Sequence, residues 1–166
     1  MNAGAYGGET WERIKSVKTI DRQGEIHERL PIDYEIDYRS VNGPDNEWFL
    51  EAVLQFDPEI EVNIETLKEM LDRRKATQPL GQPSCGSVFR NPPGDHAARL
   101  IEAAGLKGYR IGGAEVSDKH ANFIISSDGA SATDVEQLVS YVQQAVADQH
   151  GVKLIREVCI VGEPAS

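Results

Sequence analysis

The sequence predicts an α+β fold, in which helices lie on one side of a sheet. Apolar residues recur at helical spacing in separate stretches, and short apolar runs typical of strands lie between them. Two helices interleaved with short strands are typical of an α+β layer. At 166 residues, the chain is long enough for one well-buried core, or for one domain and part of another.

Composition and charge argue against several functions. Hydrophobic residues make up 40% of the chain and charged residues 27%, as in a soluble globular protein. No apolar run approaches the roughly 20 residues that span a bilayer, and no signal peptide is expected, so we predict a cytoplasmic protein without a membrane partner. The net charge of -10 disfavours a nucleic-acid surface, and an anionic ligand therefore needs a local cluster of cations.

The first stretch, residues 2–9, is glycine-rich, and we interpret it as a loop. Such loops bring backbone N–H groups close to phosphates or flat cofactors when a scaffold holds them. No strand precedes this one, so a flexible tail is the alternative interpretation.

A hairpin is predicted next. Ile14, Val17 and Ile20 lead to a turn at residues 21–25. Ile26 then begins the returning strand.

A further strand and a helix follow. Residues 48–56 carry the clearest strand signal, and the Asp-Pro pair at 57–58 stops it. Apolar residues at helical spacing then predict a helix from Ile64 to Lys75, which ends in a run of three basic residues. Cations in a last helical turn suit the helix dipole, which explains this run without any ligand.

Residues 83–94 concentrate small residues, hydroxyl groups and a thiol in a turn that runs into a strand. Gly86 permits a tight turn, and Ser87 presents a compact hydroxyl group directly after it. Val88 and Phe89 are expected to anchor the following residues in a core. The segment can carry chemistry, and the alternative is a structural turn.

Beyond this turn, helix and strand alternate. Asp95 is expected to cap a helix that runs to about Ala104 and ends at Gly105. Residues 112–117 are expected to form a loop, and residues 123–126 a short buried strand.

The last part of the chain predicts another helix and another strand. Thr133 or Asp134 opens the helix, and Gly151 ends it. The helix has an apolar stripe, formed by Val135, Leu138, Val139, Val142 and Val146. Residues 154–162 are the last expected strand.

Several separated motifs stand in an order that is specific to one family. They lie at residues 2–9, 38–40, 78–80, 83–94, 112–123 and 156–158. Together they closely resemble the UDP-N-acetylenolpyruvoylglucosamine reductase family, also called UDP-N-acetylmuramate dehydrogenase. The resemblance covers the whole chain but only the later part of the family's enzymes. It implies that residues 1–57 end an FAD-binding α+β domain whose N-terminal half is absent, and that residues 58–166 form a small α+β substrate-binding domain.

The resemblance implies a flavin-dependent oxidoreductase of peptidoglycan synthesis, and hence a role in cell wall biogenesis, cell shape and cell division. In this family NADPH reduces bound FAD, and the flavin passes hydride to UDP-N-acetylglucosamine enolpyruvate to give UDP-N-acetylmuramate. FAD and NADPH are therefore the expected cofactors. Hydride addition builds an enolate on the neighbouring carboxylate, so the site needs cationic stabilisation and a proton donor.

The resemblance also assigns catalytic roles. Ser87 matches the serine that donates a proton to the enol. Arg39 and Glu157 match the arginine and the glutamate that bracket the substrate carboxylate. By pattern alone, Arg39 is a surface cation on a polar segment and Glu157 an outward-facing strand residue.

Binding roles follow from the same comparison. The expected cofactor contacts are Ala3, Gly4, Ala5, Tyr6 and Gly7. The expected substrate contacts are Arg73, Arg74, Lys75, Lys119 and Asn122. The first three of these are candidates for the UDP diphosphate, because guanidinium groups pair well with phosphate. His120, in the same segment as Lys119, is expected to satisfy a local hydrogen bond.

Two departures from the family pattern bear on activity. Cys159 stands where the family often has an arginine, and no part of the chain matches the family's flavin pyrophosphate loop. Cys85 and Cys159 match no metal-ligand spacing, so we expect two reduced thiols and no metal. The alternative function is a non-catalytic UDP-sugar-binding module that lacks flavin.

Overall fold

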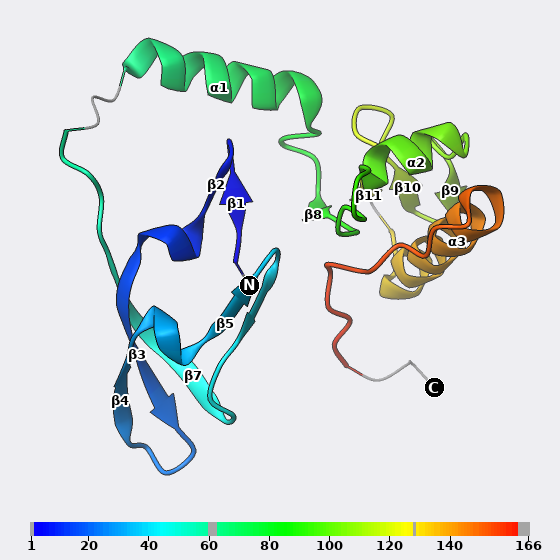
Figure 1. Ribbon diagram of the computed structural model, residues 1–166. Helices are drawn as coiled ribbons and strands as arrows, with labels where there is room; N and C mark the ends of the chain where they lie inside the picture. The colour runs from blue at the N-terminus through cyan, green and yellow to red at the C-terminus, as the bar shows by residue number, and fades with distance from the viewer. Residues whose placement is uncertain (1, 60–62, 128, 163–166) are drawn as a thin grey trace. The chain divides into compact units, whose positions relative to one another are not determined.

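The structure is a computed structural model that describes residues 2–59, 63–127 and 129–162 (Figure 1). The chain divides into two compact units, residues 1–62 and 63–166, and each is described by itself. The functional boundary expected between residues 57 and 58 stays a prediction.

The first unit is built on an antiparallel sheet with the strand order β4-β3-β7. Its strands are β3 (Ile14–Asp21), β4 (Ile26–Arg29) and β7 (Glu47–Leu54). The predicted hairpin is confirmed, because Ile20 pairs with Ile26 across the turn. The Asp21 carboxylate holds this turn by accepting hydrogen bonds from the backbone N–H groups of Gln23 and Glu25 at 2.9 and 3.0 Å.

Two small hairpins flank this sheet. They are β1 (Gly4–Ala5) with β2 (Gly8–Glu9), and β5 (Glu35–Asp37) with β6 (Ser40–Asn42). Two 3-10 helices connect the elements, η1 (Thr10–Arg13) and η2 (Pro31–Asp33). The interpretation of residues 2–9 as a plain loop was therefore wrong. These strands are too short for an alternating pattern to reveal them.

Apolar packing in the first unit is thin. The rings of Trp11, Tyr34 and Phe49 form a cluster with centroid separations of 4.7, 5.7 and 6.0 Å. Several large apolar side chains of β7 are exposed, among them Trp48 and Leu50, which are 51% and 54% accessible.

The second unit begins with α1 (Ile64–Thr77), which confirms the predicted helix. The Asn63 side chain caps it by accepting a hydrogen bond from the N–H of Glu65 at 2.8 Å. No residue within α1 is buried, so its apolar stripe stays accessible in this unit.

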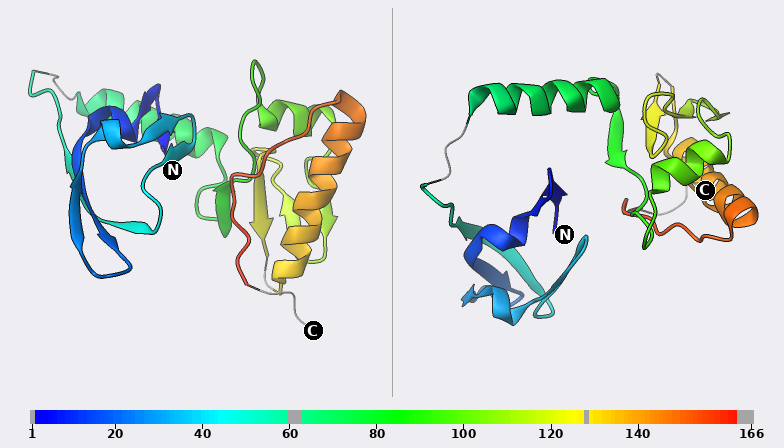
Figure 2. Two further views of the ribbon diagram at one scale, coloured as in Figure 1. Left: turned by 60° about the horizontal axis from the view of Figure 1, so that its bottom comes forward. Right: turned by 45° about the horizontal axis from the view of Figure 1, so that its top comes forward.

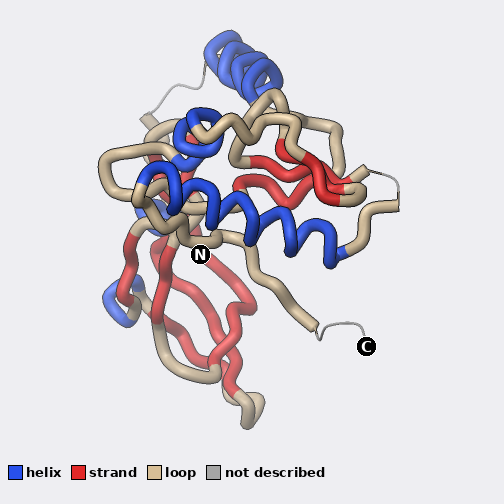
Figure 3. Tube along the Cα trace, turned by 90° about the vertical axis from the view of Figure 1, so that its right-hand side faces the viewer, coloured by secondary structure: helices blue, strands red, loops and turns tan. Residues whose placement is uncertain are grey.

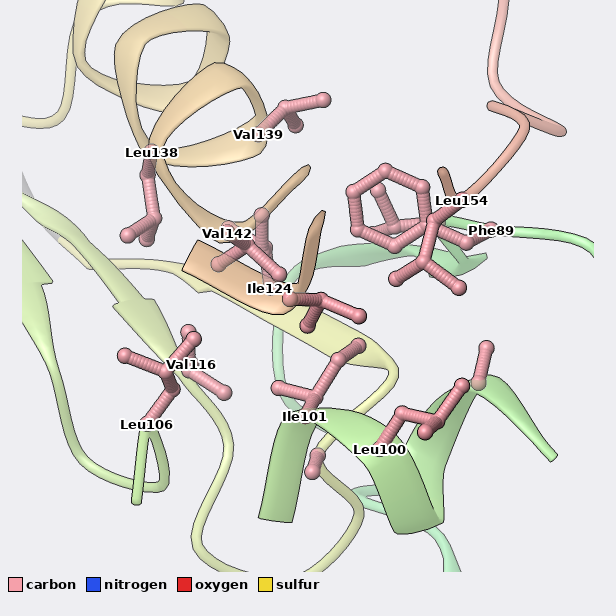
Figure 4. Close-up of a cluster of buried hydrophobic side chains, with 14 of the residues drawn as sticks. Phe89, Leu100, Ile101, Leu106, Val116, Ile124, Leu138, Val139, Val142 and Leu154 are labelled. Carbon is pink, nitrogen blue, oxygen red and sulfur yellow. The ribbon is translucent and has the colours of Figure 1, made fainter. Parts of the chain in front are cut away.

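The core of the second unit lies between two helices and an antiparallel sheet with the order β8-β11-β10-β9. The strands are β8 (Ser84–Ser87), β9 (Arg110–Ile111), β10 (Ala114–Val116) and β11 (Phe123–Ser126), and the helices are α2 (Ala97–Ala103) and α3 (Ala132–His150). Helix α3 packs on β9 and β10 and contacts α2 (Figures 2 and 3). Figure 4 shows Leu138 and Val142 of α3 in one buried cluster with Ile101 of α2, which confirms the predicted stripe.

The predicted starts of α2 and α3 were wrong by one or two residues. Helix α2 begins at Ala97, and its first N–H is satisfied by the Asn91 side chain at 3.1 Å. Asp95 lies outside the helix and pairs with Arg99 at 2.7 Å instead. Helix α3 is capped by Ser131, whose hydroxyl accepts a hydrogen bond from the N–H of Asp134 at 3.1 Å. Several polar residues stand near each start, and the structure shows which of them bonds to the free N–H groups.

Two further expectations fail in the second half. Residues 112–117 are not a loop, because they contain β10 after a tight turn at the two glycines. Residues 154–162 are not a strand, since only a single bridge pairs Arg156 with Phe89. Both cysteines are free and exposed, as expected.

Candidate functional site

Ser87 ends β8 directly after a β-bulge. Ser87 pairs with Phe123 and Ser84 pairs with Ile125, so β8 carries one more residue than its partner over this interval. Gly86 provides the extra residue with a left-handed φ of +82°. No atom lies within 4 Å of the place where a Cβ would sit on Gly86, so its φ, and not crowding, calls for glycine. Bulges of this kind redirect the next side chain, and Ser87 is half-buried here.

Glu157 is attached to the same segment through its backbone. Its N–H donates to the carbonyl oxygen of Val88 at 2.8 Å, and the N–H of Arg90 donates to the carbonyl oxygen of Ile155 at 2.9 Å. The structure therefore brings Glu157 next to the residue that follows Ser87. These two predicted catalytic residues come from distant parts of the sequence.

The buried side chain of Asn122 holds the other edge of this segment. Its Oδ1 accepts a hydrogen bond from the N–H of Phe89 at 3.0 Å, and its Nδ2 donates to the carbonyl oxygen of Phe89 at 2.8 Å. Its backbone carbonyl accepts from the N–H of Val88 at 2.9 Å. Asn122 is only 4% accessible. Its expected contact with substrate stays a prediction.

The basic end of α1 meets the segment that contains Lys119. The Lys119 ammonium group donates to the backbone carbonyl of Lys75. The Nε of Arg74 donates to the Gln78 side chain at 3.1 Å, and the residues of the basic run are exposed. Two of the expected substrate contacts, Lys75 and Lys119, thus lie together.

His120 makes the local hydrogen bond expected of it. Its Nδ1 accepts from the N–H of Asn122 at 3.3 Å, and its ring packs edge-on against Phe123 at 4.8 Å. Burial lowers the pKa of His120, which favours the neutral ring that this contact needs.

In the first unit, a hollow of about 290 Å³ joins the two small hairpins. Its lining consists of Gly4, Ala5, Tyr6, Gly7, Gly8, Glu9, Tyr38 and Arg39. Four expected cofactor contacts and the expected catalytic arginine therefore line one surface. Ala3 lines a neighbouring hollow instead, and its carbonyl accepts from the N–H of Thr10 at 2.9 Å.

Two non-glycine residues of this hollow have a left-handed backbone. Tyr6 has a φ of +54° and Arg39 a φ of +55°. Such conformations cost about 1–2 kcal/mol for an ordinary side chain, and they concentrate at functional sites. The Arg39 guanidinium lies 5.7 Å from the ring centre of Tyr38, beside it in the turn.

Asn2 is a residue that the sequence interpretation missed. It is 1% accessible, and its Oδ1 accepts from the N–H of Trp11 at 3.1 Å. Its Nδ2 donates to the Glu9 carboxylate and to the carbonyl oxygen of Asp37 at 3.4 Å. Asn2 thus links the hairpin that carries Tyr6 to the hairpin that carries Arg39. No periodic pattern could reveal it, because its partners are distant in sequence.

Arg39 belongs to the first unit, whereas Ser87 and Glu157 belong to the second. The grouping of all three as one catalytic centre stays a prediction. Over the described ranges, no helix has the length and apolar content needed to cross a lipid bilayer. Within the same ranges, no three His, Cys, Asp or Glu side chains converge as metal ligands would.

Comparisons with known proteins point to one family. The sequence profile of the family "UDP-N-acetylenolpyruvoylglucosamine reductase, C-terminal domain" matches residues 78–161. UDP-N-acetylenolpyruvoylglucosamine reductase of Alkalilimnicola ehrlichii is 56% identical over 167 residues, which cover 100% of this chain and 56% of that protein. The protein of the same name from Legionella pneumophila is 53% identical over 165 residues, with 98% and 54% covered.

A solved structure shows the same fold. It is the crystal structure of UDP-N-acetylenolpyruvylglucosamine reductase from Thermus caldophilus, with a TM-score of 0.76 and 34% sequence identity. The match covers 95% of this chain and 56% of that chain. The chain thus spans about half the length of the curated relatives it matches.

Proposed function

This chain belongs to the UDP-N-acetylenolpyruvoylglucosamine reductase family, and we propose that it carries the catalytic side chains of that reaction. The reaction is the NADPH-dependent, FAD-mediated reduction of UDP-N-acetylglucosamine enolpyruvate to UDP-N-acetylmuramate in peptidoglycan synthesis. The observation that carries the proposal is the hydrogen bond from Glu157 to Val88, which places Glu157 beside the Ser87 segment. The expected location is the cytoplasm.

Arg39, Glu157 and Ser87 have different roles toward the substrate. When bound, FAD supplies the hydride that NADPH provides. Arg39 and Glu157 bracket the substrate carboxylate, and the guanidinium stabilises the negative charge that develops on it as an enolate. Ser87 donates the proton to the adjacent carbon.

Ser87 is suited to this role by its surroundings more than by its acidity. A neutral serine hydroxyl is a weak acid, so the transfer requires a strongly basic acceptor such as an enolate carbon. The Ser87 side chain is half-buried, which limits competition from bulk water. The bulge at Gly86 sets the direction in which the side chain leaves the strand.

The hollow in the first unit fits one face of a flat ring. Glycine and alanine backbone form much of its lining, so a planar group can approach closely. Open space surrounds the Cβ position of Gly7. Arg39 is the only cation among the described lining residues, which suits a ring and one carboxylate better than a pyrophosphate. We therefore assign Gly4, Ala5, Tyr6 and Gly7 to the ring of FAD.

The basic end of α1 supplies the diphosphate contacts. Arg73, Arg74 and Lys75 are exposed in the last turns of the helix, and Lys119 joins them through the Lys75 carbonyl. Because the whole chain carries a net charge of -10, this local cluster is where an anionic diphosphate is attracted.

A second candidate function is a UDP-sugar-binding module without catalysis. One observation favours it: the second unit has its own hydrophobic core and also holds the basic cluster. Such a module would need neither Arg39 nor flavin.

Absorbance and melting measurements separate the two functions. A reductase that binds flavin absorbs light at roughly 450 nm after purification or addition of FAD. A binding module stays colourless, and UDP-N-acetylglucosamine raises its melting temperature. Replacing Arg73, Arg74 and Lys75 by glutamine should remove that rise in melting temperature under both proposed functions. Absence of both signals in the unmodified chain contradicts both functions.

A further inference from the structure

Asn122 holds the segment that follows Ser87 and pairs with Glu157. Val88 links Ser87 to Glu157, and the N–H and C=O groups of the next residue, Phe89, both point to the Asn122 side chain. The opposite edge of the same segment pairs with residues 155–157 through Arg90 and Val88. A side chain therefore takes the place of a neighbouring strand.

An asparagine amide suits this place chemically. It offers a donor and an acceptor in a fixed plane, which match the N–H and C=O of a single extended residue. Asn122 and Phe89 are 4% and 2% accessible, so water cannot replace either bond. A leucine of similar size offers neither bond.

We propose that Asn122 is a positioning residue that sets the separation of Ser87 and Glu157. It acts through the backbone of Val88 and Phe89: Asn122 bonds to both residues, and Val88 directly follows Ser87 and accepts the hydrogen bond from Glu157. The inference rests on the proposed function only in that the separation of Ser87 and Glu157 matters for that reaction. In this role Asn122 touches no substrate atom.

Amide hydrogen exchange on the full chain tests the geometry. In Asn122→Leu, we expect exchange at the N–H groups of Phe89 and Glu157 to accelerate by about tenfold or more relative to helix α3. The control is Val142→Ala, which weakens the same core without removing a hydrogen bond to Phe89. It should accelerate all globally exchanging amides of the second unit by one common factor. The same uniform pattern in Asn122→Leu would overturn the proposal.

A conservative variant provides a rescue that a purely structural role would not show. In Asn122→Asp, the protonated carboxyl can both donate and accept, whereas the ionised form only accepts. Burial raises the pKa of such a carboxyl, so protection at Phe89 and Glu157 should recover as the pH falls. His120 is the titratable side chain bonded to residue 122, so unmodified protein at each pH corrects for its titration. If exchange at Phe89 and Glu157 in Asn122→Asp does not depend on pH after this correction, the inference is contradicted. Asn122→Asp also tests the inference if Asn122→Leu does not fold.

Binding of UDP-N-acetylglucosamine separates this inference from the proposed function. A positioning residue leaves the dissociation constant within about twofold in Asn122→Asp at low pH, where both bonds are restored. Loss of binding with unchanged exchange at Glu157 would make Asn122 a substrate ligand and overturn the proposal. If unmodified protein binds no UDP-sugar, the proposed function fails, while the exchange experiment still decides the role of Asn122.

Discussion

The backbone N–H of Glu157 donates to the carbonyl oxygen of Val88 at 2.8 Å. This bond attaches the C-terminal segment to the residue after Ser87, although residues 154–162 form no regular strand. Backbone hydrogen bonds between these two segments thus determine which two predicted catalytic residues are neighbours.

Ser87→Ala, made in a complete reductase, tests the proton donor. We expect flavin reduction by NADPH to stay nearly unchanged and flavin reoxidation by substrate to slow by about a hundredfold to ten-thousandfold. Stopped-flow absorbance measures the two half-reactions separately. Cys85→Ala is the matched control, because its exposed thiol has no proposed role. Equal loss in both half-reactions would contradict the assignment.

Gly86→Ala tests the bulge. A side chain at a φ of +82° is strained although the space is open, so the free energy of unfolding should fall by about 1–2 kcal/mol. Urea unfolding measures this change. Ser84→Ala in the same strand is an exposed control and should change stability by less than about 0.5 kcal/mol. If both variants match the unmodified protein, the bulge is not set by Gly86.

Arg39→Gly and Arg39→Ala together test the strained turn. Both variants remove the side chain, and they differ only in how the backbone tolerates a φ of +55°. The glycine variant should be more stable than the alanine variant by about 1 kcal/mol, and both should lose reductase activity in a complete enzyme. Chemical unfolding of the first unit, followed by Trp11 fluorescence, gives the difference. Equal stabilities would argue against a strained Arg39.

Asp134→Asn tests a pH-dependent contact. Hydrogen bonds from the N–H groups of Ser131 and Gly113 lower the pKa of Asp134 below its ordinary value of 3.8. The carboxylate therefore contributes stability above that value, and the contribution is lost as the pH falls through the lowered pKa. We expect the variant to melt below the unmodified protein at pH 7 and the gap to close toward pH 2. A gap that is constant from pH 7 to pH 2 would rule out this contact as its cause.

Gly113→Ala tests the turn that receives Asp134. A Cβ on Gly113 would lie 2.6 Å from the Cα of Ala130, a backbone atom that cannot move aside cheaply. We expect a loss of about 1–3 kcal/mol in the free energy of unfolding of the second unit. Gly129→Ala is a contrasting control, since its left-handed φ of +85° strains an alanine while the space around it is open. A smaller effect at Gly113 than at Gly129 would count against close packing here.

Periodicity predicted the longer elements. The apolar stripe of α3 is the clearest case, because Leu138, Val139, Val142 and Val146 are all buried. The β3–β4 hairpin followed from apolar residues on both sides of a glycine-containing turn. A stripe or a turn signal is a local property of the chain, so it can be seen without knowing any partner.

The parts that failed depend on which of several neighbours a group contacts. Asn91, and not Asp95, satisfies the start of α2, and β10 is a strand because β9 and β11 lie beside it. The motif order named Ser87, Arg39, Glu157 and Asn122, but it did not indicate the hydrogen bonds that Asn2 and Asn122 make. These amides bond to the backbone of residues far along the chain, which no local pattern records.

The sequence by itself determined the fold class, the main helices and the family, because spacing and motif order are written in the chain. Only the tertiary structure decided that Glu157 joins the Ser87 segment and that Tyr6 shares a hollow with Arg39. The physical reason is that these arrangements depend on backbone hydrogen bonds between distant segments. Such bonds involve groups that every residue carries, so side-chain identity alone does not specify them.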